Sequence, residues 1–466
     1  MKKISKLETL HTNIEGASNN KIVLINLPSK TYKIDGMEEE FGFNPSFALI
    51  SLGTWLELNG YEPILIDLCC QYMSKNEVFN ILKNENPIIV GLSVHTENTE
   101  FAMTLARLIK IDFPSIKIVF GGAHPTLVPD DIITSDYVDF IIRKEGEATL
   151  LELTEAIATN ENAISFEKIP GLLFKRNSKA IKNSFRAPIN DLDIMPLPKR
   201  EFFNINRYSH VANILTGRGC PGNCVYCAAK ALSGSEYRSR AIENVILEII
   251  LLKYCMGDRL KKISILDDTF TVIPERVIRF VELLNKYKVN IPWRCASRID
   301  ILTEEFLDII ESGGCTEILY GIESGCQEVL DKIKKQIDLD FAKKMIKYTY
   351  KKGILPILSF IFGHYCDTKE SMGETLNFIR ETYTNYKAEI AVFYNTPYPG
   401  TWQYINKDKL GIKIVADKFS LYTCMIPIIE TENFSLNDLR EFYLESIKYS
   451  GRSLNIEISK KNSFDT

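Results

Sequence analysis

Short apolar runs alternate with longer amphipathic stretches from about residue 21 to residue 158. The runs are KIVLINLP, PILIDL, IIVGLSV, IKIVFGG and YVDFIIR, and helical patterns separate them. Strands that are buried on both faces form continuous apolar runs of this kind, because helices cover both sides of a parallel sheet. The pattern predicts an α/β domain with a doubly wound, five-stranded parallel sheet. Any ligand of such a sheet would lie across the carboxyl ends of its strands.

A second alternating series follows in the other half of the chain. Its apolar runs are HVANILTGRG, KKISILDD, IPWRCAS, CTEILYGIES, GILPILSFIFG and EIAVFYNTPYPG, again with helical patterns between them. Six consecutive β/α units favour a partial (β/α)6 barrel of the TIM type over another doubly wound sheet. In barrels the reactive residues lie at the carboxyl ends of the strands.

These two series divide the chain into five parts. We expect an N-terminal extension at 1–20, the doubly wound domain at 21–160, a linker at 161–207, the partial barrel at 208–405 and a C-terminal helical extension at 406–466. The linker is rich in Lys, Asn and Pro and contains a possible hairpin at GLLFKRNSKAIKNSF. The C-terminal extension contains one convincing helix, Leu436 to Ser450, and the sequence assigns it no role.

Composition narrows the classes of partner. The 466 residues include 45% hydrophobic and 25% charged residues and carry a formal net charge of −4, which gives no electrostatic argument for nucleic acid. No apolar run reaches the ~18 residues of a spanning helix, and residues 1–20 lack the apolar core of a secretory signal. We therefore expect a cytoplasmic, reducing location. In that compartment clustered cysteines are metal ligands more often than disulfides.

Three cysteines lie at ligand spacing directly after the first strand of the second series. The segment GRGCPGNCVYCAAK places Cys220, Cys224 and Cys227 in one short loop, where three thiolates can bind three corners of a 4Fe-4S cluster. The fourth iron would stay open to chelate a small molecule. Zinc is the weaker alternative, since it normally takes four ligands and no second Cys or Cys/His pair follows. The same segment satisfies GxGxxG, which is typical of dinucleotide-binding loops. Its cysteines, however, occupy the place where the pyrophosphate of a dinucleotide would lie, which argues against such a site.

This loop resembles the hallmark CxxxCxxC of the radical S-adenosylmethionine (SAM) superfamily, including the aromatic residue before the third Cys. Further matching segments are ILDDTF, ASRID, YGIESG and NTPYPGT at the ends of later barrel strands. Bound SAM needs partners for its sulfonium, ribose and adenine, which strand-end carboxylates and an arginine can provide. The alternative for each such residue is a purely structural network. The resemblance implies these SAM contacts: Tyr226, Asp268, Arg298, Glu323 and Ser324.

The arrangement of domains resembles the subclass that carries an N-terminal cobalamin-binding domain. The loops GLSVHTENT, GGAHPT and KEGEATLLEL match that subclass, although Lys144 stands where the family usually has glycine and FGHYCDTKES stands where LPGET is expected. The axial-histidine motif DxHxxG is absent, which implies that cobalt need not have a protein histidine ligand. A domain without corrinoid, or one that binds a nucleotide, is the alternative. The implied cobalamin contacts are Ser93, Thr96, Gly121, Gly122, His124, Glu145, Gly146 and Glu147.

The resemblance implies an enzyme that cleaves SAM reductively to a 5′-deoxyadenosyl radical, most simply a C-methyltransferase acting on an unactivated carbon. A cyclase or rearrangement enzyme with the same cofactors, and a non-catalytic corrinoid or redox sensor, are the alternatives. A methylthiotransferase fits less well, because such enzymes carry extra cysteines in the N-terminal domain to bind a second cluster. Here the first domain contains only Cys69 and Cys70. The implied partners are an organic substrate of unknown identity and an external one-electron reductant of the flavodoxin or ferredoxin type. No catalytic side chain is assigned.

Overall fold

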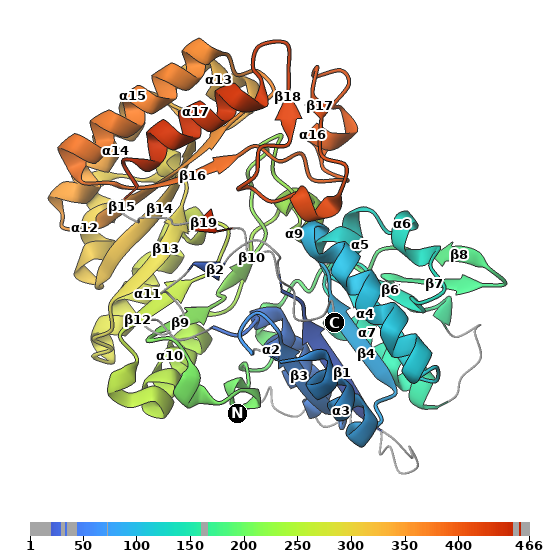
Figure 1. Cartoon of the computed structure of the whole chain (residues 1–466). Helices are drawn as coiled ribbons and strands as arrows, with labels where there is room; N and C mark the ends of the chain where they lie inside the picture. The colour runs from blue at the N-terminus through green and yellow to red at the C-terminus, as the bar shows by residue number, and fades with distance from the viewer. Residues whose placement is uncertain are drawn as a thin grey trace.

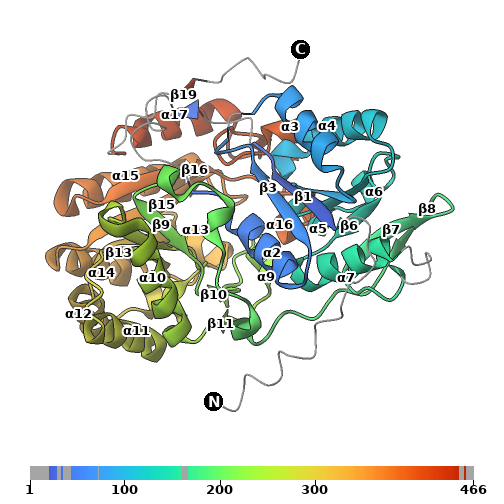
Figure 2. The same ribbon diagram turned by 90° about the horizontal axis from the view of Figure 1, so that it is seen from below.

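The computed structural model describes residues 20–28, 33–34, 44–71, 73–159, 166–450 and 456–457. Within these residues the chain forms two large sheets, each flanked by helices, that lie side by side (Figure 1, Figure 2). Most of the N-terminal extension predicted at 1–20, and most of the tail after residue 450, lie outside the described residues. Within the described part, no helix combines the length and apolar character needed to cross a membrane.

The N-terminal sheet has the predicted five parallel strands, in the order β3-β1-β4-β5-β6. Two antiparallel strands, β7 and β8, extend it beyond β6. They are the hairpin expected in the linker, and Phe174 of β7 packs with Phe140 of β6 and with Phe166. The strands are β1 (Lys21–Asn26), β3 (Glu62–Asp67), β4 (Ile89–Ser93), β5 (Lys117–Gly121), β6 (Phe140–Ile142), β7 (Leu172–Arg176) and β8 (Lys179–Lys182).

Helices cover both faces of this sheet, as its continuous apolar runs require. Along β1, Ile22 and Leu24 belong to one buried cluster, while Val23 and Ile25 belong to another on the opposite face. The first cluster includes residues of α2 and α7, and the second includes residues of α3 and α4. These helices are α2 (Phe47–Leu58), α3 (Lys75–Glu85), α4 (Thr99–Asp112) and α7 (Glu147–Ala158).

The second sheet contains six parallel strands in consecutive order, β9-β12-β13-β14-β15-β16, which confirms the predicted partial barrel. Helices α10, α11, α12, α14 and α15 line its outer side (Figure 1). The strands are β9 (Val211–Ile214), β12 (Lys262–Ile265), β13 (Trp293–Ser297), β14 (Cys315–Glu323), β15 (Leu355–Phe362) and β16 (Glu389–Tyr394). The helices are α10 (Ile242–Met256), α11 (Pro274–Lys286), α12 (Glu304–Ser312), α14 (Leu339–Lys351) and α15 (Lys369–Tyr386).

The C-terminal extension contacts both halves of the molecule. Its helix α17 (Leu436–Ile447) packs on the barrel, where Tyr443 stacks on Tyr394 with ring centroids 4.7 Å apart. Phe419, which precedes this helix, packs edge-on against His124 of the N-terminal domain at 4.8 Å. The extension therefore ties the barrel to the doubly wound domain.

Candidate active site

A cavity of about 530 Å³ lies between the carboxyl ends of the N-terminal strands and the start of the barrel. Gly91, Ser93 and Gly121 line it from the sheet, and Leu215 and Leu266 line it from the barrel. Both domains contribute, so a ligand here would touch the doubly wound sheet on one side and the first barrel strands on the other. This is the place that the sequence predicts for a ligand of the sheet.

Glycines keep the sheet side of the cavity flat. A Cβ atom on Gly121 would meet no atom nearer than the Ile142 carbonyl oxygen at 3.9 Å, so a side chain here would project into the cavity. At Gly122 (φ +108°) a Cβ atom would lie 2.7 Å from the carbonyl oxygen of Val94. Gly121 therefore leaves room for the face of a large planar ring such as a corrin, whereas Gly122 is required by its positive φ and by the close approach of the Val94 backbone.

Six of the eight predicted cobalamin residues line this cavity: Ser93, Gly121, Gly122, Glu145, Gly146 and Glu147. Thr96 and His124 are not among the lining residues. Both are buried, and Nδ1 of His124 lies 3.2 Å from Oγ1 of Thr96 while its ring packs on Phe419. Burial lowers the pKa of His124 to about 4. The histidine that does line the cavity is His95, at the end of β4.

The three cysteines lie in a loop between two short paired strands, β10 (Gly217–Arg218) and β11 (Arg238–Ser239). Gly222 lies between the first two sulfurs, since a Cβ there would be 3.4 Å from Cys220 Sγ and 3.8 Å from Cys224 Sγ. The backbone N–H of Ala229 points at Cys227 Sγ at 3.4 Å. Among the described residues, no three His, Cys, Asp or Glu side chains converge as around a single metal ion. The ligands of a cubane bind separate iron atoms and do not need to converge.

Arg298 and Glu323 lie close to this loop. Arg298 donates to Asp300 through Nε (3.1 Å) and Nη2 (2.7 Å), and its Nη1 is 3.2 Å from the Cβ position of Gly222. Glu323 has φ +75°, uncommon outside glycine, and its carboxylate lies 3.4 Å from Nζ of Lys335. Burial raises the pKa of Glu323, and Lys335 opposes that shift.

The other predicted SAM residues differ in their surroundings. Tyr226 packs against His364 with ring centroids 5.3 Å apart, and burial, together with the nearby Glu323 charge, raises the pKa of Tyr226. Asp268 lines the cavity, where partial loss of solvent and the neighbouring Asp267 carboxylate raise its pKa. Ser324 is fully buried, and its hydroxyl lies 3.1 Å from that of Thr375 on α15. This contact is typical of a structural network.

Sequence reasoning missed two contributors to this region. Lys335 pairs with Glu323, but it lies in the run KIKKQ, where nothing distinguishes one lysine from its neighbours. Arg218 directly precedes the cysteine loop and lines the cavity. The GRGC segment could have drawn attention to it, because a charged residue beside a cluster loop needs a partner.

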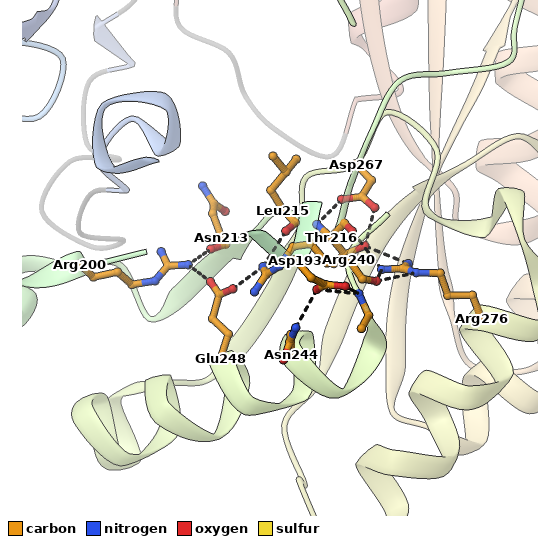
Figure 3. A network of polar contacts seen from close by, with 11 residues as sticks. Asp193, Arg200, Asn213, Leu215, Thr216, Arg240, Asn244, Glu248, Asp267 and Arg276 are labelled. Atoms are coloured by element: carbon orange, nitrogen blue, oxygen red, sulfur yellow. Dashed lines mark hydrogen bonds and ion pairs between the residues drawn. The ribbon is translucent and has the colours of Figure 1, made fainter. Parts of the chain in front are cut away.

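A network of buried polar groups supports the base of the cysteine loop (Figure 3). Asp267, at the end of β12, accepts hydrogen bonds from the backbone N–H of Thr216 (2.6 Å) and from its hydroxyl (2.5 Å). Farther along, Glu248 of α10 pairs with Arg200 of the linker and with Arg240, each at 2.6 Å. The linker and the loop base are thus fixed to the barrel by paired charges.

A three-cysteine loop after the first strand of a partial barrel, facing a doubly wound sheet across an apolar cavity, defines a radical SAM enzyme with a corrinoid-binding domain. Comparison with known proteins agrees with this class. The family model described as the Radical SAM superfamily matches residues 214–379, and the B12 binding domain matches residues 42–154. The chain therefore carries a radical SAM domain and a B12 binding domain.

Relatives with curated names include two different activities. The chain is 29% identical to an uncharacterized methyltransferase of Pyrococcus horikoshii over 80% of each chain. It is 25% identical to the anaerobic magnesium-protoporphyrin IX monomethyl ester cyclase of Rubrivivax gelatinosus, over 88% of this chain and 74% of that one. The fold is similar to that of the radical SAM methyltransferase TsrM from Kitasatospora setae, with a TM-score of 0.73, 15% identity and coverage of 96% and 93%.

Proposed function

We propose that this chain is a cobalamin-dependent radical SAM C-methyltransferase acting on an unactivated carbon. The observation that carries the proposal is the cavity between the two domains, lined by strand-end glycines on one side and by residues that flank the cysteine loop on the other. A substrate between these walls would have cobalamin on one side and the cluster on the other. The methyltransferase of Pyrococcus horikoshii, similar over four fifths of each chain, supports the same outcome.

The cofactors supply the bond-making chemistry. When bound, the cluster would supply one-electron reductive cleavage of SAM for removal of hydrogen from the substrate carbon, and cobalamin would supply the methyl group. The residues of this chain bind, orient and exclude water. Cys220, Cys224 and Cys227 would hold the cluster, and Tyr226, Arg298 and Glu323 would surround SAM, with Asp268 facing the cavity. Leucines such as Leu215 and Leu266 keep the reacting region dry.

The proposal includes partners and location. The substrate is an organic molecule, and the electron comes from an external one-electron donor of the flavodoxin or ferredoxin type, which fits a reducing cytoplasm. Nucleic acid has no place in this scheme.

A second candidate function is ring closure or rearrangement with the same cofactors. Its support is the similarity to the cyclase of Rubrivivax gelatinosus, which extends over 88% of this chain. Methyl transfer consumes two SAM molecules per turnover, one as the radical source and one as the methyl donor, whereas cyclisation needs only the first. S-adenosylhomocysteine is therefore the product that separates the two functions.

The test uses anaerobically reconstituted protein with cobalamin, SAM and a strong reductant. A methyltransferase is expected to form both 5′-deoxyadenosine and S-adenosylhomocysteine, the latter only when cobalamin is present. Formation of 5′-deoxyadenosine alone would favour the cyclase. Formation of neither product by protein with a full cluster would contradict both proposals and support a non-catalytic sensor.

A further inference from the structure

Four charged side chains meet across the boundary between the two domains. Glu147 receives a hydrogen bond from Nη2 of Arg218 at 2.6 Å, and Glu145 receives one from Nη2 of Arg238 at 2.6 Å. Nη1 of Arg218 also lies 3.6 Å from Glu145, which joins the two pairs into one cluster. The side chains are only 6 to 17% exposed. We call these four residues the interdomain charge cluster.

Each carboxylate of this cluster also has a second hydrogen-bond partner. Glu147 also accepts a hydrogen bond from the Ser51 hydroxyl at 3.1 Å, and Glu145 accepts one from the backbone N–H of Ile189 at 2.8 Å. The sequence suggested that these residues contact cobalamin, and they do line the cavity. Oε1 of each carboxylate, however, accepts a hydrogen bond from an arginine of the opposite domain.

Both arginines lie on the strands that enclose the cysteine loop. Arg218 is on β10, two residues before Cys220, and Arg238 is on β11, which pairs with β10 after the loop returns. The opposite side of the same strands is held by the barrel, since Asp267 binds Thr216 and the Tyr237 hydroxyl (2.7 Å). The loop base is therefore fixed between the barrel and the N-terminal domain.

The ion pairs that hold the loop base lie in largely buried surroundings, which makes them costly to break. Removing one partner of a buried ion pair is strongly destabilising, because the other charge stays in a poorly solvated place. An exposed pair contributes little to stability. The interdomain charge cluster therefore tolerates little movement of β10 and β11 relative to the loop Glu145 to Glu147.

Radical transfer depends on this spacing. Reacting atoms must come within about 3 to 3.5 Å, and a misplacement of ~1 Å can lower a rate about 100-fold. The iron–sulfur cluster would be attached to the barrel, and the corrinoid to the N-terminal sheet. Only contacts between the two domains can fix the distance from the iron–sulfur cluster to the corrinoid.

We infer that Glu145 and Glu147 are positioning residues, which hold the cluster-bearing loop at a set distance from the corrinoid cavity through Arg218 and Arg238. The inference rests on the proposed function, because it needs both cofactors. It gives the EGE segment a role that is different from direct contact with the corrinoid.

The test compares Glu147→Gln with a matched control, Glu243→Gln, whose partner Arg279 is 49% exposed and which is itself 61% exposed. Holoenzyme with both cofactors is reduced so that the cluster and cob(II)alamin are both paramagnetic, and pulsed EPR measures the spin coupling between them. We expect Glu147→Gln to retain iron and corrinoid but to shift or broaden the distribution of couplings. Glu243→Gln should match the wild type.

Two outcomes would overturn the inference. An unchanged coupling in Glu147→Gln would mean that the carboxylate does not set the spacing. Loss of corrinoid with iron retained would make the carboxylate a direct corrinoid ligand. If the variant loses both cofactors, Arg218→Lys, which keeps the charge but not the two-pronged geometry, is measured by the same criteria. A wild-type protein that binds no corrinoid or forms no 5′-deoxyadenosine would instead contradict the proposed function.

Discussion

Gly219, next to the first cysteine, has a conformation and a contact that a side chain cannot share. Its φ is +95°, and an added Cβ atom would lie 2.2 Å from the carbonyl oxygen of Glu236, whereas ordinary contacts begin near 3.4 Å. Gly234, in the same loop, has nearly the same φ, +88°, but a Cβ there would meet nothing within 4 Å. The two glycines therefore separate the cost of backbone strain from the cost of a clash.

The magnitudes follow from these contacts. Alanine in a positive-φ conformation that glycine favours costs roughly 1 to 3 kcal/mol, which both Gly219→Ala and Gly234→Ala would incur. Only Gly219→Ala must also move one backbone segment by about 1 Å, because the clashing atom is a carbonyl oxygen that cannot rotate away, and overpacking of this kind adds about 1 to 3 kcal/mol. That movement would displace Cys220, its neighbour in the chain.

The assay is iron and sulfide content after anaerobic reconstitution, with all cysteines intact in both variants. We expect Gly234→Ala to hold about four irons per chain, as the wild type would, and Gly219→Ala to hold less than half as many. Thermal unfolding of the apoprotein should rank the variants in the same order. Equal iron content in the two variants would refute the reasoning, because it would show that close packing of the loop on Glu236 is not needed for the cluster.

Three further predictions test the cavity, a buried histidine and the polar network. Gly121→Leu should fill the cavity and abolish corrinoid absorbance while iron content stays unchanged. The control Gly373→Leu, where a Cβ meets no atom within 4 Å, should change neither corrinoid absorbance nor iron content. Corrinoid retained by Gly121→Leu would argue against the site. Because burial lowers the pKa of His124 to about 4 from an ordinary 6.5, its neutral ring stabilises the fold above pH 6.5, and this contribution is lost as the pH falls toward 4. Between pH 6.5 and 4, the unfolding free energy of the wild type should therefore fall by up to about 3 kcal/mol more than that of His124→Asn, as measured by urea titration. Parallel pH profiles of the two proteins would contradict this. Glu248→Gln, which leaves two buried arginines unpaired, should lower the unfolding free energy by about 3 kcal/mol or more, and a loss below about 1 kcal/mol would show that this network is dispensable.

The strands of both sheets were predictable because their signal is local. Each apolar run, such as that of β1, carries its own pattern, and the cysteine loop carries its spacing within eight residues of sequence. The pairing of the hairpin β7–β8 with β6 was not predicted, because a strand's partner is set by tertiary packing and not by its own residues.

The side-chain directions in the loops were harder to predict. His124 was expected to face the corrinoid, yet it turns inward to Thr96 because Phe419, from the far end of the chain, covers it. Glu145 and Glu147 meet arginines that lie 93 and 71 residues away. No pattern within one loop reveals such partners, so the match of the loop to the cobalamin-binding subclass predicted ligand contacts but not these ion pairs.

Anaerobic iron, sulfide and corrinoid analysis of the wild type and of Cys224→Ala would show whether the three-cysteine loop holds the iron–sulfur cluster. Cys255→Ala is the matched control, since Cys255 is an exposed cysteine on α10, outside the loop. The account predicts about four irons per chain, one corrinoid and 5′-deoxyadenosine formation for the wild type and the control. Cys224→Ala should lose the iron and the activity while keeping the corrinoid. Retention of about four irons by Cys224→Ala would contradict the account, because the cluster would then be held elsewhere.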